Sequence, residues 1–132
     1  ITARKVSCTL TLEDSVHGAR ESIQFPRFLF VTCMSHRYEG GGFMFCPPAI
    51  DHDGVLDLCT VGNISKGLVL LALPTAFFGR HYFVKGIDAH TATQMSITTS
   101  APLWVHTDGE VTRQSRGFRV ECLPGAIRMI TP

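Results

Sequence analysis

The sequence has few charged residues and lacks the common metal- and nucleotide-binding motifs. Only 17% of its 132 residues are charged, and the formal net charge is +1. The scattered lysines and arginines form no clustered basic patch of the kind that nucleic-acid binding usually requires. Neither a C-x-x-C pair nor an H-E-x-x-H motif occurs, which excludes the usual zinc-ribbon, thioredoxin-like and zincin signatures. We therefore expect no nucleic-acid partner.

Long hydrophobic runs are also absent. The longest, residues 68–78, is interrupted and falls short of the ~20 residues that a membrane-spanning helix needs. Residues 1–5 contain neither an initiator methionine nor the apolar segment of a secretory signal peptide. From this start we expect a piece of a longer protein. From the short apolar runs we expect no membrane-spanning helix.

Cysteine is present, but in an odd number and without close spacing. Most of the cysteines lie inside or beside apolar runs, where a free thiol behaves as a small hydrophobic side chain. This pattern favours a reducing, cytoplasmic compartment over a disulfide framework. The five are Cys8, Cys33, Cys46, Cys59 and Cys122.

The apolar residues that are present, 45% of the total, are enough for one domain with a core, spanning 1–132. Strict alternation over 4–12 predicts a half-buried strand, and the nearly continuous apolar run 23–33 predicts a strand in the middle of the fold. An N-cap at Asn63 or Ser65 predicts one short helix over about 64–78. Further strands are predicted at 55–61, 83–87, 91–99, 103–107, 117–123 and 126–130. Many short strands separated by turns indicate an all-β sandwich, mostly antiparallel, with one helical insertion.

Two acidic loops, each with a glycine, stand out in this weakly charged chain. One is Asp108-Gly109-Glu110 and the other runs over 51–57. Asp-Gly between β-rich runs is first of all a hairpin signal, because a type I′ turn needs positive φ at both central residues. A pair of such loops also suggests a site. The triple glycine 40–42 is followed by no G-K-[ST], so it predicts a close backbone approach or a sharp bend between strands and not a phosphate loop.

Five motifs in order are similar to a known family. They are Gly40-Gly41-Gly42, Pro48-x-x-Asp51-x-Asp53-Gly54-x-Leu56-Asp57, Gly79-Arg80-His81 after a short helix, Asp108-Gly109-Glu110, and Ala126-Ile127-Arg128-Met129-Ile130 before a proline. In this order and spacing, over essentially the whole chain, they resemble the C-terminal domain of the soluble bacterial diacylglycerol kinases and lipid kinases, relatives of sphingosine kinases and NAD kinases.

The resemblance implies a two-domain kinase. An α/β N-terminal domain with a Gly-Gly-Asp-Gly-Thr nucleotide loop would bind ATP, and this chain contains no such loop. The present chain would be the C-terminal half, a β-sandwich that faces the nucleotide and helps to bind the lipid. In one departure from the family pattern, Met34-Ser35-His36 stands where asparagine is expected, which leaves a polar role there in doubt.

Site residues follow from the same resemblance. Asp108 matches the aspartate taken as the general base on the lipid hydroxyl, and Glu110 matches the glutamate beside it. Asp53 matches a structural magnesium site, which the backbone carbonyls of Ile50 and Val55 and bound waters would complete. The implied cofactors are Mg²⁺ and ATP, the latter bound mainly by the N-terminal domain.

For other residues of these motifs, two interpretations of their role are open. Asp51 and Asp57 either support the metal site or are solvated. Arg80 and His81 either contact phosphate or lipid headgroup, or His81 is a hydrogen-bonded structural histidine.

The expected partners are a lipid substrate at the inner membrane face and the chain's own nucleotide-binding domain, with a homodimer left open. Two rival functions remain. One is a non-catalytic β-sandwich binding module whose Asp-Gly loops are only turns. The other is a hydrolase that uses His106 or His81 with Asp108, although no G-x-S-x-G motif supports it.

Overall fold

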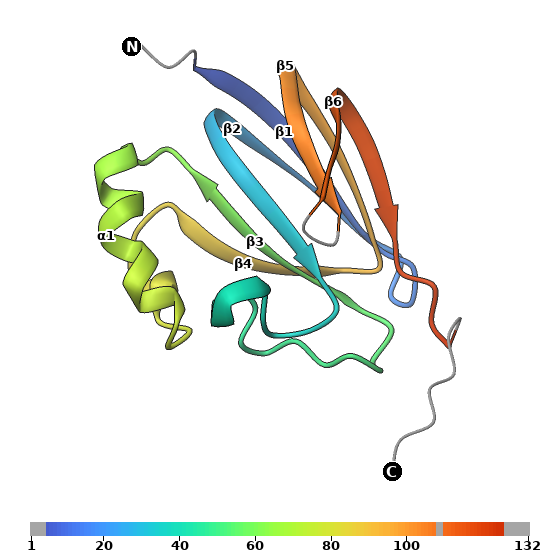
Figure 1. The fold of residues 1–132 in the computed structure, drawn as a ribbon. Helices are drawn as coiled ribbons and strands as arrows, with labels where there is room; N and C mark the ends of the chain where they lie inside the picture. The colour runs from blue at the N-terminus through green and yellow to red at the C-terminus, as the bar shows by residue number, and fades with distance from the viewer. Residues whose placement is uncertain (1–4, 108–109, 126–132) are drawn as a thin grey trace.

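A computed structural model describes residues 5–107 and 110–125. It consists of one curved, six-stranded sheet with the order β4-β3-β2-β1-β5-β6, in which every neighbouring pair is antiparallel (Figure 1). The strands are β1 (Val6–Asp14), β2 (Ala19–Met34), β3 (Leu56–Gly62), β4 (Ile87–Ala92), β5 (Gln94–Thr107) and β6 (Glu110–Glu121). The helical elements are η1 (Gly40–Gly42), α1 (Lys66–Ala76) and η2 (His81–Phe83). The predicted all-β, sandwich-like class with one helical insertion is confirmed.

Strand β1 shows why alternation in the sequence predicts a strand so well. Val6, Cys8, Leu10 and Leu12 are buried, while the residues between them are exposed or partly buried. Successive side chains of a strand point to opposite faces, and Cys8, Leu10 and Leu12 enter one core. Strand β2, predicted to lie in the middle of the fold, does pair on both sides, with β1 and with β3.

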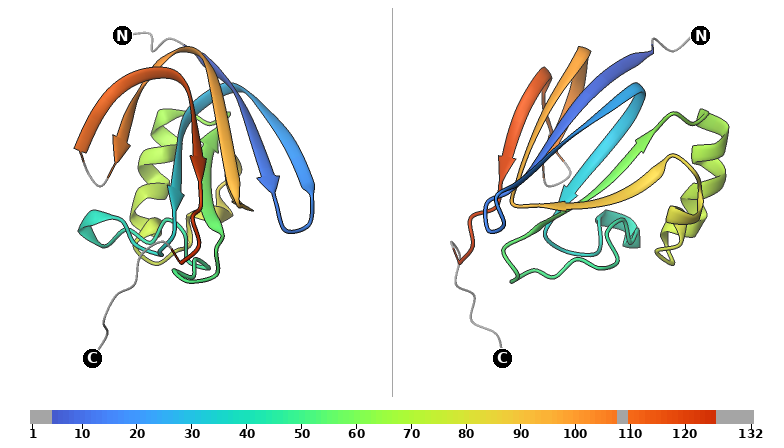
Figure 2. Two further views of the ribbon diagram at one scale, coloured as in Figure 1. Left: turned by 90° about the vertical axis from the view of Figure 1, so that its right-hand side faces the viewer. Right: turned by 180° about the vertical axis from the view of Figure 1, so that it is seen from behind.

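The sheet bends where prolines interrupt its ladder. The β1–β2 register shifts between the pairs Val6–Phe28 and Cys8–Phe25, which bracket Pro26. The β5–β6 register shifts between Thr98 and Leu103, next to Pro102. Proline has no N–H to donate, so it sits at bulges, and bulges increase the local bend and twist of a strand. Figure 2 shows β5 and β6 arching over the rest of the sheet.

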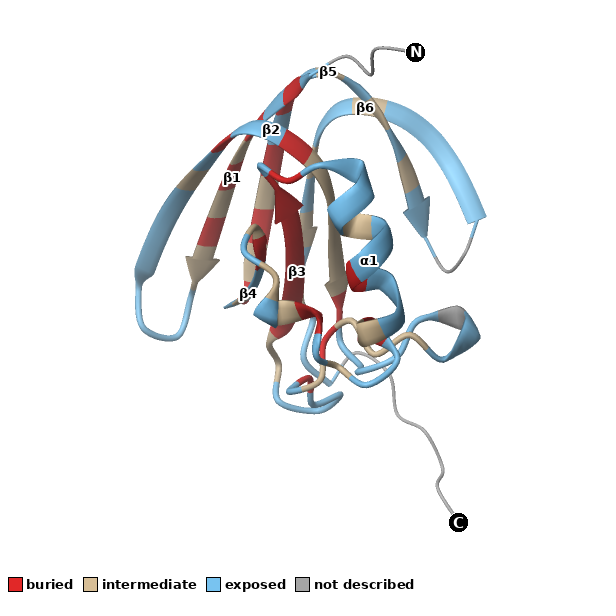
Figure 3. Ribbon diagram, turned by 90° about the vertical axis from the view of Figure 1, so that its left-hand side faces the viewer, coloured by how far each residue is buried: buried red, intermediate tan, exposed pale blue. Residues whose placement is uncertain are grey.

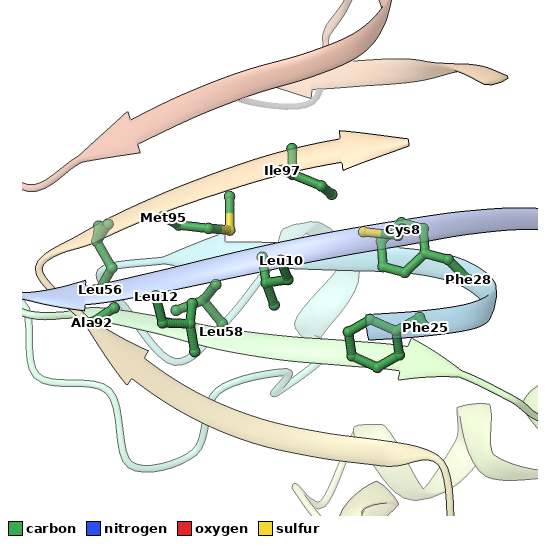
Figure 4. Close-up of a cluster of buried hydrophobic side chains, with 10 residues drawn as sticks. All are labelled: Cys8, Leu10, Leu12, Phe25, Phe28, Leu56, Leu58, Ala92, Met95 and Ile97. Carbon is green, nitrogen blue, oxygen red and sulfur yellow. The ribbon is translucent and has the colours of Figure 1, made fainter. Parts of the chain in front are cut away.

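The concave side of this curved sheet holds the main core, whose buried side chains come from β1 to β5 (Figure 4). Partly buried residues of β6, such as Phe118 and Val120, pack on the same cluster. The fold is therefore sandwich-like although the sheet is continuous. The buried members are Cys8, Leu10, Leu12, Phe25, Phe28, Leu56, Leu58, Ala92, Met95 and Ile97.

A second cluster on the other side of β3 is covered by α1 and by the segment 43–49. It includes Cys46, Cys59, Val61 and Ala72. Because β3 lies between the two clusters, all seven of its residues are buried, and Figure 3 shows it red throughout.

The helix begins as predicted at the second N-cap candidate. The Ser65 hydroxyl accepts a hydrogen bond from the Leu68 N–H at 3.2 Å, satisfying a donor that has no partner within the helix. Gly40–Gly42 forms a short turn that brings Glu39 and Phe43 together as a bridge, which confirms the bend predicted there.

Several predicted strand bounds are wrong. The strand predicted at 117–123 is the second half of β6, which begins at Glu110 and ends at Glu121. No strand covers 83–86: η2 ends at Phe83, and β4 begins only at Ile87. Gly86 takes a φ of 100° between them and packs against Ile64 and the Gly62 carbonyl, so the chain turns before entering the sheet. The separate strands predicted at 91–99 and 103–107 belong largely to one long bent strand, β5. The strand predicted at 126–130 lies outside the described residues.

Candidate functional site

The acidic loop that precedes β3 is a tight turn. Asp53 is exposed, and its Oδ1 accepts a hydrogen bond from the Val55 N–H at 3.0 Å. Gly54 follows with a φ of 73°. An aspartate that bonds the backbone two residues on is a standard turn element, so this loop forms a turn. The second carboxylate oxygen of Asp53 is not used by this hydrogen bond and can bind another group.

Asp57 has a different environment from the rest of the loop. It is only 5% exposed and is partnered with Thr91 in the β3–β4 ladder. Burial raises the pKa of its carboxyl above the ordinary value, and the negative charge of Asp53 adds to this. The interpretation of Asp57 as a solvated side chain is therefore wrong.

A small cavity of about 130 Å³ lies beside Asp57. Sequence reasoning missed it, since its walls come from four separate parts of the chain. It is lined by Cys46, Pro48, Asp57, Leu58, Tyr82, Ala89, His90 and Thr91.

Asp51, in contrast, is solvated. Its Oδ1 lies 2.7 Å from His52 Nδ1, and both side chains are largely exposed. This hydrogen bond lowers the pKa of the Asp51 carboxyl. The carboxylate is occupied locally and has no described contact with Asp53.

The second acidic stretch lies at the tip of the β5–β6 hairpin. Thr107 and Glu110 are paired at the last register position, and the Glu110 side chain is exposed. Asp108 and Gly109, which connect them, lie outside the described residues. The role predicted for Asp108 therefore stays a prediction.

The two acidic stretches form separate candidate sites. Glu110 begins β6, whereas the turn of Asp53 lies beside the chain that follows the end of β6: a Cβ on Gly54 would lie 3.2 Å from Pro124 Cγ. No hydrogen bond joins Glu110 and Asp53 within the described residues, in which the Asp53 carboxylate bonds the Val55 N–H.

His81 is a structural residue. It is only 3% exposed, and its Nε2–H donates to the Phe45 carbonyl at 3.1 Å, with the Tyr82 hydroxyl donating to the same oxygen. Burial lowers the pKa of its imidazole, which favours the neutral form. His81 is thus poorly placed to contact phosphate or to serve a hydrolase, while the neighbouring Arg80 is exposed.

Two buried cysteines are poorly reactive. The five cysteines are all free, and burial raises the pKa of Cys46 to about 12 and of Cys59 to about 11. A protonated thiol is a poor nucleophile and a poor metal ligand.

Residues 5–107 and 110–125 contain no cluster of three or more histidine, cysteine, aspartate or glutamate side chains suited to a metal ion. A cation at Asp53 would therefore depend on that carboxylate, backbone carbonyls and water. This donor set suits Mg²⁺, which takes oxygen ligands and keeps several of its waters.

Comparison with known proteins agrees with the motifs. Residues 3–131 match the family described as the YegS C-terminal NAD kinase beta sandwich-like domain. A protein of Xanthomonas euvesicatoria pv. vesicatoria named "Probable lipid kinase YegS-like" is 34% identical over 98 residues, which cover 73% of this chain and 31% of that protein. A Mycobacterium tuberculosis diacylglycerol kinase is 28% identical over 97 residues, covering 73% of this chain and 30% of the relative.

A solved structure shares the fold. The crystal structure of a diacylglycerol kinase from Bacillus anthracis str. Sterne aligns over 95% of this chain and 40% of that chain, with a TM-score of 0.63 and 23% identity. The present chain thus spans less than half of this structure and less than a third of the two relatives named above. The match over residues 3–131 nevertheless covers nearly all of this chain, which therefore belongs to the YegS C-terminal NAD kinase beta sandwich-like domain family.

Proposed function

We propose that this chain is the C-terminal, lipid-binding half of an ATP-dependent lipid kinase that phosphorylates a hydroxyl of diacylglycerol or a related lipid. The observation that carries the proposal is the family match over residues 3–131, together with relatives named as lipid or diacylglycerol kinases. The Asp108-Gly109-Glu110 motif, placed between the paired strands β5 and β6, supplies the chemistry.

In this proposal Asp108 accepts the proton of the lipid hydroxyl as its oxygen attacks the γ-phosphorus of ATP. Phosphoryl transfer depends mainly on positioning and on charge stabilisation, and the acceptor proton needs a base within reach. Glu110 is two residues further along the sequence, at the start of β6, and in this proposal its exposed carboxylate orients Asp108 or binds a metal-bound water.

Magnesium is the cation we propose at the other acidic loop. Asp53 would hold it through its remaining carboxylate oxygen, helped by the carbonyls of Ile50 and Val55. When bound, the ion would stabilise the turn that leads into β3. It would also offset the repulsion that Asp53 exerts on the buried Asp57.

Millimolar Mg²⁺ is accordingly expected to raise the unfolding temperature of the wild-type chain. Ligand at about 100 times its Kd adds about 2.7 kcal/mol to the free energy of unfolding. Asp53→Asn should abolish the shift, because the amide oxygen can still accept the turn hydrogen bond while the charge is lost. Asp51→Asn, on an equally exposed neighbour, is the matched control and should keep the shift. Equal shifts in wild type and Asp53→Asn would leave the loop as a turn only.

ATP would be held mainly by a nucleotide-binding domain outside this chain. We therefore expect the purified 132-residue chain not to phosphorylate diacylglycerol with radiolabelled ATP, whereas a protein joining it to such a domain should do so. The assay compares label in the extracted lipid for the two proteins. If the isolated chain transferred label at the rate of the joined protein, this would contradict the proposal that ATP is held mainly by a separate domain.

A non-catalytic binding module is the second candidate. The turn hydrogen bond of Asp53 favours it, since that loop already has a structural explanation. The two candidates differ in what they require of Asp108, and its substitution separates them.

A partner domain, a homodimer and a place at the inner face of the membrane also remain proposals.

A further inference from the structure

Helix α1 is more apolar on its outward side than a surface helix should be. Only Ala72 and Ala76 of its residues are buried, while Leu70 is 70% exposed and Leu71 is 75% exposed. A typical surface helix has an apolar stripe toward the core and polar residues opposite. In Figure 3 the helix is pale blue along most of its length. A partner outside the described residues is needed to cover this apolar side of the helix.

The apolar surface continues past the end of the helix. Phe78 is 76% exposed and Phe83, in the adjacent η2, is 88% exposed. Single exposed apolar residues are common, but a contiguous group marks an interaction site. We call this group the α1–η2 face; it consists of Leu68, Leu70, Leu71, Leu73, Phe77, Phe78 and Phe83.

Within residues 63–86, the segment that carries the α1–η2 face, all formal charges have one sign. Residues 63–86 contain Lys66, Arg80 and Lys85 and no aspartate or glutamate. All three cations are exposed, and none forms an ion pair within residues 5–107 and 110–125. An apolar face edged by unpaired cations is complementary to a surface that is apolar inside and anionic outside.

We propose that the α1–η2 face docks on an anionic lipid bilayer. Leucine and phenylalanine side chains enter the boundary between headgroups and acyl chains, and Lys66, Arg80 and Lys85 contact the lipid phosphates. The inference rests on the proposed function, because a kinase acting on a membrane lipid must reach it at the bilayer surface. It adds which part of the chain makes that contact.

A second copy of the chain fits this face less well. In a two-fold symmetric dimer the same patch lies on both sides of the interface, so the three cations of one copy would face those of the other. Like charges brought together repel, and the segment has no carboxylate to compensate them.

Vesicle co-sedimentation of the 132-residue chain, without ATP, tests the proposal. We expect binding to phosphatidylcholine vesicles that contain about one-third phosphatidylglycerol, and much weaker binding to pure phosphatidylcholine; each cation should contribute about fivefold in affinity. Leu71→Gln combined with Phe78→Ser should reduce binding at least about tenfold. Lys66→Gln and Lys85→Gln should each weaken binding to the anionic vesicles and reduce its dependence on salt.

Matched controls lie far from this face. Val16→Gln, on the β1–β2 turn, alters an apolar residue that is 77% exposed, and Arg20→Gln removes an exposed cation at the start of β2, on the same hairpin. Both should bind like wild type. Unfolding temperatures of all variants show that each is folded, which these exposed positions should allow.

Three outcomes would overturn the proposal. They are no binding to the anionic vesicles, equal binding by wild type and the Leu71→Gln/Phe78→Ser variant, and a dimer in light scattering that the same variant dissociates. Because the assay requires no turnover, an inactive kinase would not affect its result. Both proposals would be supported if the Leu71→Gln/Phe78→Ser variant of the whole kinase kept its rate on detergent-dispersed lipid but no longer bound vesicles.

Discussion

Asp108→Asn is expected to lower kcat of the assembled two-domain kinase by ~10²–10⁴-fold, the usual contribution of a general base. The amide has nearly the size of the carboxyl and favours the same turn conformations, so the β5–β6 hairpin should form as before. What is lost is the group that accepts the proton of the lipid hydroxyl. Steady-state kinetics with saturating ATP and lipid, together with the unfolding midpoint, measure the two effects separately.

Neighbouring substitutions show whether catalysis or turn formation is the role of this motif. Glu110→Gln should reduce kcat to a similar or smaller extent, depending on whether Glu110 binds metal or orients Asp108. Gly109→Val should mainly destabilise the protein if the turn requires positive φ there. Should Asp108→Asn turn over at the wild-type rate while Gly109→Val unfolds, the motif is a hairpin turn without a catalytic role.

Leu10→Ala should lower the free energy of unfolding by about 2–5 kcal/mol, the range for a large-to-small change in a packed core. Leu10 is 0% exposed and lies in β1 opposite Ile23 of β2 and Ile97 of β5. Its removal would leave a cavity where the concave side of the sheet is most tightly enclosed. Chemical denaturation followed by circular dichroism gives the change directly.

Leu71→Ala makes the same chemical change on the surface and serves as the control. Leu71 is 75% exposed on α1, and alanine is an excellent helix former, so the free energy of unfolding should change by no more than about 0.5 kcal/mol. Comparable losses in the two variants would mean that α1 is covered in the isolated chain, contrary to the described structure.

Local patterns in the sequence were sufficient for several elements. The alternation of Val6, Cys8, Leu10 and Leu12 predicted β1, because the two-residue period of a strand follows from backbone geometry alone. Ser65 marked the helix start, since N-capping involves only adjacent residues. The motif order also identified the family and its candidate residues.

Other features depend on segments that are distant in the sequence. Gly86 takes its positive φ where Ile64 and the Gly62 carbonyl approach it, and this turn delays β4 beyond the predicted start. The burial of Asp57 likewise requires chain far from β3: its cavity is walled by Cys46, Tyr82 and Thr91.

The sequence by itself thus determined the all-β class, the helix and the acidic motifs, because each is encoded by neighbouring residues. Only the tertiary structure decided that Asp53 and Glu110 lie at different ends of β6, that His81 is buried, and that the leucines of α1 face outward. Exposure and proximity are properties of packed surfaces. They are set by how the sheet curves and by which segments cover it, and no local pattern of residues specifies either.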